Sequence, residues 1–119
     1  MVSRLGRFLR KLRIDNNLIL KDMADMLEVT SSMLSAVENG KKSAPLEWED
    51  KIINNYNLSE EDKEELHNSI LESIKQIRID IESNDYDRAN VAISFARNFE
   101  ELNEEKIKKI FDILESNGD

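Results

Sequence analysis

The sequence contains no cysteine, so neither a disulfide nor a thiolate metal site can hold the fold together. Long hydrophobic runs are also missing: stretches such as Leu18-Ile19-Leu20 span three residues, against the roughly 20 apolar residues that cross a bilayer. No signal-peptide core follows Met1. We therefore expect a cytoplasmic protein that makes no contact with a membrane.

Glycine and proline are scarce, with three glycines and one proline in 119 residues. Both residue types interrupt helices, whereas Leu, Ile, Glu and Lys, which are plentiful here, favour them. Charged residues make up 35% of the chain. The composition predicts an all-α protein, in a chain long enough for one ordinary domain or for a small domain with a small extension.

Positively charged residues are fewer than negatively charged ones, and the net charge of the chain is −8. The two signs are unevenly distributed along the sequence. Residues 1–45 carry eight Lys or Arg and five Asp or Glu, whereas residues 46–119 carry nine and twenty. The sign of the whole chain therefore says little about the partner of the N-terminal part, which is mildly basic.

Four short helices are expected in the first 58 residues. Ser3 is a suitable N-cap for the first helix, and residues 15–17 end it. The second helix is expected over residues 21–27. Thr30 is a suitable N-cap for the third, which stops before Gly40, and Pro45 favours the start of a fourth. These helices predict a domain over residues 1–58.

Three further helices are expected over residues 59–119. Ser59 begins a long acidic helix, and two more helices follow, one near residues 86–99 and one capped by Asn103. The long helix carries an apolar stripe at helical spacing, formed by Leu66, Ile70, Ile74, Ile77 and Ile81. One sequence does not decide between core and interface for this stripe. We assign it to the interface of a region that dimerises or binds a partner protein.

The third expected helix has an unusual outward face. Leu34 and Val37 are its inward residues, and the opposite side carries only small or uncharged residues: Ser31, Ser32, Ser35, Ala36 and Asn39. A solvated helix in an acidic protein would normally present Glu and Lys there. A face without long charged side chains can approach another surface closely, and a helix of this width fits the major groove of DNA.

Several stretches together resemble one family: "FLRKLR", Met23-Ala24, "LEVTSSMLSAVENGKK" and the Pro45 that follows. They are similar to the lambda-repressor-like helix-turn-helix family, of the Cro/CI or XRE type, over residues 4 to about 58. The resemblance implies that residues 21–27 and 30–39 form the two helices of the motif, and that double-stranded DNA is the partner.

The resemblance also assigns roles to individual residues. The base-reading positions are Ser31, Ser32, Met33, Ser35 and Ala36, and the phosphate-contacting candidates are Lys21, Asn39, Lys41, Lys42, Arg4 and Arg7. Arg13 and Glu38 match a structural ion pair between the first and third helices. None of the reading positions carries Arg, Gln or Asn, so specificity must come from apolar contacts, DNA shape or a dimer that covers two half-sites.

The leading hypothesis is a bacterial or phage transcriptional regulator, a repressor that binds operator DNA as a homodimer. No catalytic, cofactor or metal motif is present, and His67 lies alone in an acidic helix, so we expect neither an enzyme nor a cofactor. The alternative is a protein-interaction role, either as an antitoxin or as a phage-encoded inhibitor of the anti-CRISPR kind, in which the acidic C-terminal region binds the partner.

Overall fold

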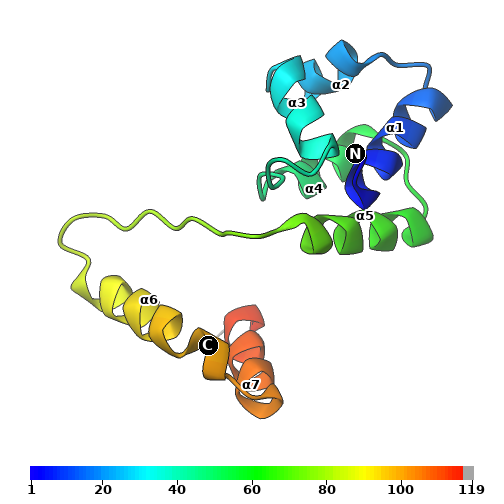
Figure 1. Cartoon of the computed structure of the whole chain (residues 1–119). Helices are drawn as coiled ribbons and strands as arrows, with labels where there is room; N and C mark the ends of the chain where they lie inside the picture. Colours follow the sequence, from blue (N-terminus) through cyan, green and yellow to red (C-terminus); the bar gives the residue numbers. More distant parts are fainter. Residues whose placement is uncertain (117–119) are drawn as a thin grey trace. The chain divides into compact units, whose positions relative to one another are not determined.

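A computed structural model describes residues 1–116 of the chain, and it is all-helical over that range (Figure 1). The elements are α1 (Arg4–Asp15), α2 (Leu20–Met26), α3 (Ser31–Glu38), α4 (Trp48–Asn55), α5 (Glu60–Ser73), α6 (Tyr86–Asn98), the short 3-10 helix η1 (Phe99–Glu101) and α7 (Glu104–Glu115). The all-α prediction is confirmed. None of the helices in residues 1–116 is both long and apolar enough to cross a bilayer.

The helices begin where short polar side chains can satisfy their first amides. Ser3, Thr30, Ser59 and Asn103 each accept a hydrogen bond from the backbone N–H three residues later. At the other end of α3, Gly40 adopts a φ of 73°, in the left-handed region where a side chain is disfavoured. Local side-chain chemistry therefore fixes the starts of most of these helices.

The chain divides into two compact units, which we call the N-terminal unit (residues 1–77) and the C-terminal unit (from residue 78 onward). The core of the N-terminal unit draws on all five of its helices. Its most deeply buried members, each no more than 1% exposed, are Leu5, Leu9, Met23, Ala24, Leu27, Leu34, Val37, Trp48, Ile52 and Leu66. Helix α1 lies at the centre and packs against both α3 and α5.

Helix α5 therefore belongs to the N-terminal unit, and the boundary lies about one helix later than the one expected at residue 58. Leu66 and Ile70 of α5 are 0% and 5% exposed within this core. They were assigned to a dimer or partner interface, and that assignment is wrong for these two residues, because both are already covered by their own chain. Burying them stabilises the N-terminal unit by roughly 1.5–3 kcal/mol each.

The rest of the apolar stripe is not helical. Helix α5 ends at Ser73, and Ile74 has an extended backbone with φ −76° and ψ 123°. Ser43 holds this end: its hydroxyl donates to the Ser73 carbonyl at 3.4 Å and accepts from the Lys75 amide at 3.3 Å. Ile74 still packs against the core, but Ile77 and Ile81 are 62% and 42% exposed. Helix α5 therefore ends near the last residue that packs against the N-terminal core.

The C-terminal unit consists of α6, η1 and α7. Phe95 and Phe99 contact each other with ring centroids 5.3 Å apart. No residue between 78 and 116 is buried. Many large apolar side chains in this range are more than 40% exposed, among them Tyr86, Val91, Ile93, Phe95, Phe99, Ile107, Phe111, Ile113 and Leu114. This unit has no closed core of its own.

Candidate nucleic-acid interface

Helices α2 and α3 are joined by a tight turn. Glu28 takes a φ of 60°, a left-handed conformation that a glycine would adopt at lower cost. The Val29 amide then donates to the Ala24 carbonyl at 2.9 Å, which folds the chain back over the end of α2. Thr30 caps α3 through a bond from the Met33 amide at 3.0 Å. Two short helices are thus held in a fixed relation by backbone bonds and one hydroxyl.

The expected inward and outward faces of α3 are those of the structure. Leu34 and Val37 are both 0% exposed in the core. The opposite side forms a shallow hollow of about 390 Å³ lined by Ser31, Ser32, Ser35, Ala36, Asn39, Leu20 and Lys41. Met33, which the family resemblance placed among the reading residues, is half-buried against the core and does not line this hollow. The hollow is therefore uncharged apart from Lys41.

The residues that follow α3 donate hydrogen bonds back to carbonyl groups of that helix. The Asn39 side-chain amide donates back to the Ser35 carbonyl at 2.9 Å, and the Lys41 amide donates to the Ala36 carbonyl at 2.8 Å. The single hydrogen of the Lys41 backbone amide is thereby used within the unit, and the Asn39 side-chain nitrogen is turned toward Ser35. The ammonium groups of Lys41 and Lys42 are exposed, and neither forms an ion pair with the described residues.

The other basic candidates for phosphate contact differ in whether a carboxylate of the same chain already pairs with them. Lys21 pairs with Asp25 at 3.0 Å on the surface of α2. Such an exposed pair is worth less than about 1 kcal/mol and can open to accept another anion. Arg7 is exposed and donates only to the Val2 carbonyl, at 3.3 Å. Arg7, Lys41 and Lys42 are therefore the candidate cations without a carboxylate partner among residues 1–116.

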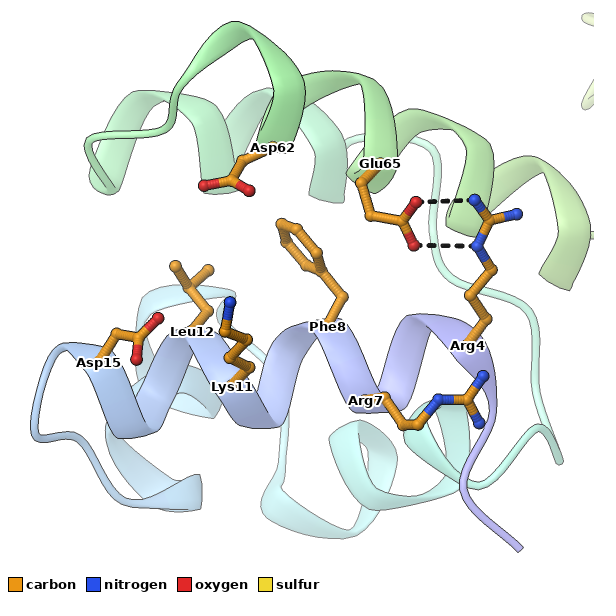
Figure 2. Close-up of a pocket in the computed structure, with 8 residues that line it drawn as sticks. All are labelled: Arg4, Arg7, Phe8, Lys11, Leu12, Asp15, Asp62 and Glu65. Atoms are coloured by element: carbon orange, nitrogen blue, oxygen red, sulfur yellow. Dashed lines mark hydrogen bonds and ion pairs between the residues drawn. The ribbon is translucent and has the colours of Figure 1, made fainter.

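Arg4 is bound to α5. Its guanidinium donates two hydrogen bonds to Glu65, at 2.9 and 2.7 Å, and a third to Glu72 at 3.0 Å. Figure 2 shows the bidentate pair bridging α1 and α5, with Phe8 pointing into the space between these helices and Arg7 turned away from it. The hydrogen bonds from Arg4 lower the pKa of Glu65, and those to the two glutamates raise the pKa of Arg4. Arg4 therefore joins two helices, and its assignment to phosphate contact is not favoured by this geometry.

The hollow around Arg4 and the hollow on α3 are separate surfaces. The first is lined by residues of α1 and α5, including Arg7, Lys11, Asp15, Asp62 and Glu65, and it shares no residue with the second (Figure 2). Three carboxylates on the α1–α5 surface oppose a polyanion. The α3 face, by contrast, has no carboxylate in its lining.

Arg13 and Glu38 are in direct contact, as the family resemblance implied. Both Arg13 terminal nitrogens donate to the Glu38 carboxylate, one of them at 3.0 Å, and Arg10 adds a bond at 3.3 Å. The side chains of Arg13 and Glu38 are 10% and 1% exposed. The Arg13 guanidinium also lies 3.3 Å from the Met23 sulfur. The pair links α1, α2 and α3 from inside, and it fixes α3 rather than touching a ligand.

The close approach of α1 to α3 was not apparent from the sequence. A Cβ atom on Gly6 would overlap the backbone carbonyl of Glu38. The same carbonyl accepts bonds from the Ser3 amide at 2.9 Å and the Ser3 hydroxyl at 3.0 Å. The pattern "SRLG" gave no sign of this contact, because it depends on a residue more than 30 positions away.

Two helices joined by a tight turn, with the second exposing a small-residue face beside free lysines, define the helix-turn-helix class. A family model described as "Helix-turn-helix domain" matches residues 4–66, which is more than half of the chain, and the protein belongs to this family. The match extends into α5, in accordance with the packing of that helix. The comparisons with curated proteins and with solved structures give no match. Membership indicates a DNA-binding protein of the regulator kind.

Proposed function

We propose that this protein is a sequence-specific transcriptional regulator, a repressor of bacterial or phage origin that acts on DNA in the cytoplasm and is not an enzyme. The observation that supports this function best is the outward face of α3. It carries Ser31, Ser32, Ser35 and Ala36 around a hollow whose single charged lining residue is Lys41, and the exposed Lys42 follows next in the chain. Short hydroxyls can bond base edges, the Ala36 methyl suits a thymine methyl, and the lysines suit phosphates.

The protein acts as a homodimer in this proposal. One recognition helix with such short side chains discriminates few base pairs, and two copies about one helical turn apart roughly double the binding free energy. Because Leu66 and Ile70 are buried in the N-terminal unit, the dimer contact is assigned to the C-terminal unit. Helices of 12 and 13 residues without a buried residue are marginal in water, so the exposed apolar side chains of α6 and α7 need a partner.

A single substitution tests the role of α3. Ser32 is exposed at the second position of the helix, where a carboxylate interacts favourably with the helix dipole. Ser32→Asp should therefore leave the free energy of unfolding unchanged or raise it by up to about 1 kcal/mol. The same carboxylate would face a phosphate or a base edge in the groove, so operator binding should fall at least tenfold.

The matched control is Asn68→Asp, which adds the same charge at an exposed position of α5. Both variants would be measured by gel shift against the DNA upstream of the protein's own gene, at several salt concentrations. If the two variants bind equally well, α3 does not enter the groove. Wild-type binding that never saturates, and that disappears by roughly 200 mM salt, would indicate nonspecific contact and contradict a specific operator.

A second function is favoured by one observation, the large exposed apolar surface of an acidic C-terminal unit. In that case the unit binds another protein, as an antitoxin binds its toxin or as a phage-encoded inhibitor of the anti-CRISPR kind binds its target. Gene neighbourhood separates the two functions, because this alternative predicts a toxin or nuclease-inhibitor gene alongside.

A further inference from the structure

The segment Ile77–Glu82 has the pattern of a β-strand. Isoleucine alternates with charged residues over six positions, "IRIDIE", and the period of two is that of a strand with one apolar face. The backbone here is not helical. Arg78 donates to the Asp80 carboxylate at 3.1 Å, which places these two side chains on the same side of the chain. The isoleucines Ile77, Ile79 and Ile81 are 62%, 70% and 42% exposed.

This strand pattern has no partner within residues 1–116. Among the backbone hydrogen bonds in that range, the segment contributes only the Glu82 carbonyl, which accepts from the Asp85 amide at 3.2 Å. A bare strand edge of this kind pairs readily with another extended chain. Ile is also among the residues most favourable in strands, because it is branched at Cβ.

We propose that Ile77–Glu82 forms an antiparallel two-stranded ribbon with the same segment of a second copy, with the two-fold axis at Ile79. This inference rests on the homodimer of the proposed function and specifies how that dimer is made. It differs from the sequence-based expectation, which placed Ile77 and Ile81 on a helix.

Charge selects both the partner and the register. With the axis at Ile79, Arg78 of each copy lies opposite Asp80 of the other, and the isoleucines lie opposite isoleucines on the second face. Moving the axis to Arg78 or Asp80 places that charge opposite itself, which is unfavourable. A parallel, in-register ribbon also pairs like charges. If the two-fold axis lay between two neighbouring residues instead of at one residue, each isoleucine would lie opposite a charged residue. The segment is therefore complementary to itself in one arrangement.

The apolar face of the ribbon also has a surface to pack on. Ile79 and Ile81 line a hollow of about 910 Å³ together with Val91 and Phe95 of α6 and Leu114 of α7. Its lining also includes the charged residues Asp80, Glu82, Asp85, Asp87 and Arg88. A two-stranded ribbon alone is marginally stable in water, and a helical layer on one face is what such a ribbon needs. Isoleucines from the strand of the second copy would fill this hollow. The same arrangement explains why no residue between 78 and 116 is buried in a single chain.

Cysteine crosslinking tests the register, because the chain contains no cysteine. In full-length Ile79→Cys protein the two introduced residues face each other across the axis with Cα atoms about 4.5–5.5 Å apart, which suits a disulfide. The matched variants Ile77→Cys and Ile81→Cys place equal residues about 13 Å apart, too far for a bond. Each protein would be oxidised with glutathione disulfide at low concentration and analysed by non-reducing electrophoresis, beside sedimentation of the reduced form.

We expect nearly complete covalent dimer for Ile79→Cys and little for either control. A mixture of Ile77→Cys and Ile81→Cys chains should crosslink, because these positions are opposite each other in the ribbon. Equal crosslinking of all three variants, or none despite a dimer in sedimentation, would overturn the strand pairing and leave the proposed homodimer intact. Reduced protein that sediments as a monomer would overturn both the ribbon and the homodimer, while DNA binding by the N-terminal unit would still be tested by the Ser32 variant.

Discussion

The buried ion pair between Arg13 and Glu38 gives the sharpest test of how the recognition helix is positioned. Replacing Glu38 by Gln keeps the shape of the side chain and removes its charge. Arg13, which is 8% exposed, then holds a positive charge with no carboxylate beside it. Leaving one partner of a buried pair uncompensated costs about 3–5 kcal/mol. Since small domains have free energies of unfolding of about 5–15 kcal/mol, this change removes a large part of the total.

The expected drop in melting temperature follows from the size of the unit. For a domain of about 60–100 residues, each kcal/mol lowers the melting temperature by roughly 4–8 °C, so Glu38→Gln should lower it by at least about 12 °C. Trp48 is the single tryptophan of the chain and is 1% exposed in the N-terminal core. Its fluorescence therefore reports the unfolding of that unit during heating or urea titration.

Two further variants separate charge from packing. Arg10→Gln removes a bond to Glu38 from a side chain that is 45% exposed, and it should cost less than about 1 kcal/mol. The double variant Arg13→Met/Glu38→Leu replaces the pair by apolar side chains and should recover most of the stability that Glu38→Gln loses. If Glu38→Gln costs under about 1 kcal/mol, or if the double variant is the less stable of the two, then the pair does not organise the interior as argued.

Three other predictions concern the same unit. Gly6→Ala should lower the free energy of unfolding by about 1–3 kcal/mol in a urea titration, because its methyl group overlaps the Glu38 carbonyl; an unchanged midpoint would contradict that contact. Lys42→Gln should weaken binding to all DNA sequences alike and reduce the slope of log K against log salt by about one, whereas a change in sequence preference would show a base contact instead. The pKa of Glu65 is lowered mainly by the hydrogen bonds from Arg4, so their stabilising effect is complete above the ordinary value of 4.5 and is lost as the pH falls through the lowered pKa. The difference in unfolding free energy between wild type and Arg4→Met should therefore shrink between pH 7 and pH 3, and a constant difference would contradict the pairing.

Much of the candidate site was predictable because its signals are local. Thr30 and Gly40 bound α3 through the chemistry of their own side chains and backbone, and the spacing of Leu34 and Val37 indicates which face turns inward. The sequence predicted less well which side chains have a hydrogen-bond donor free for a ligand. Asn39 suited a phosphate contact by its position in the family, but its amide donates to the Ser35 carbonyl in the structure.

The sequence by itself determined the helices and the uncharged face of α3, since capping and 3.6-residue periodicity act between neighbours in the chain. Tertiary structure decided the remaining features. Ser43 and the limited extent of the core end α5 at Ser73, which leaves Ile77 and Ile81 outside a helix. Likewise, Arg4 is paired with glutamates more than 60 positions away. Such contacts depend on which surfaces the packed helices bring together, and no spacing along the chain encodes that.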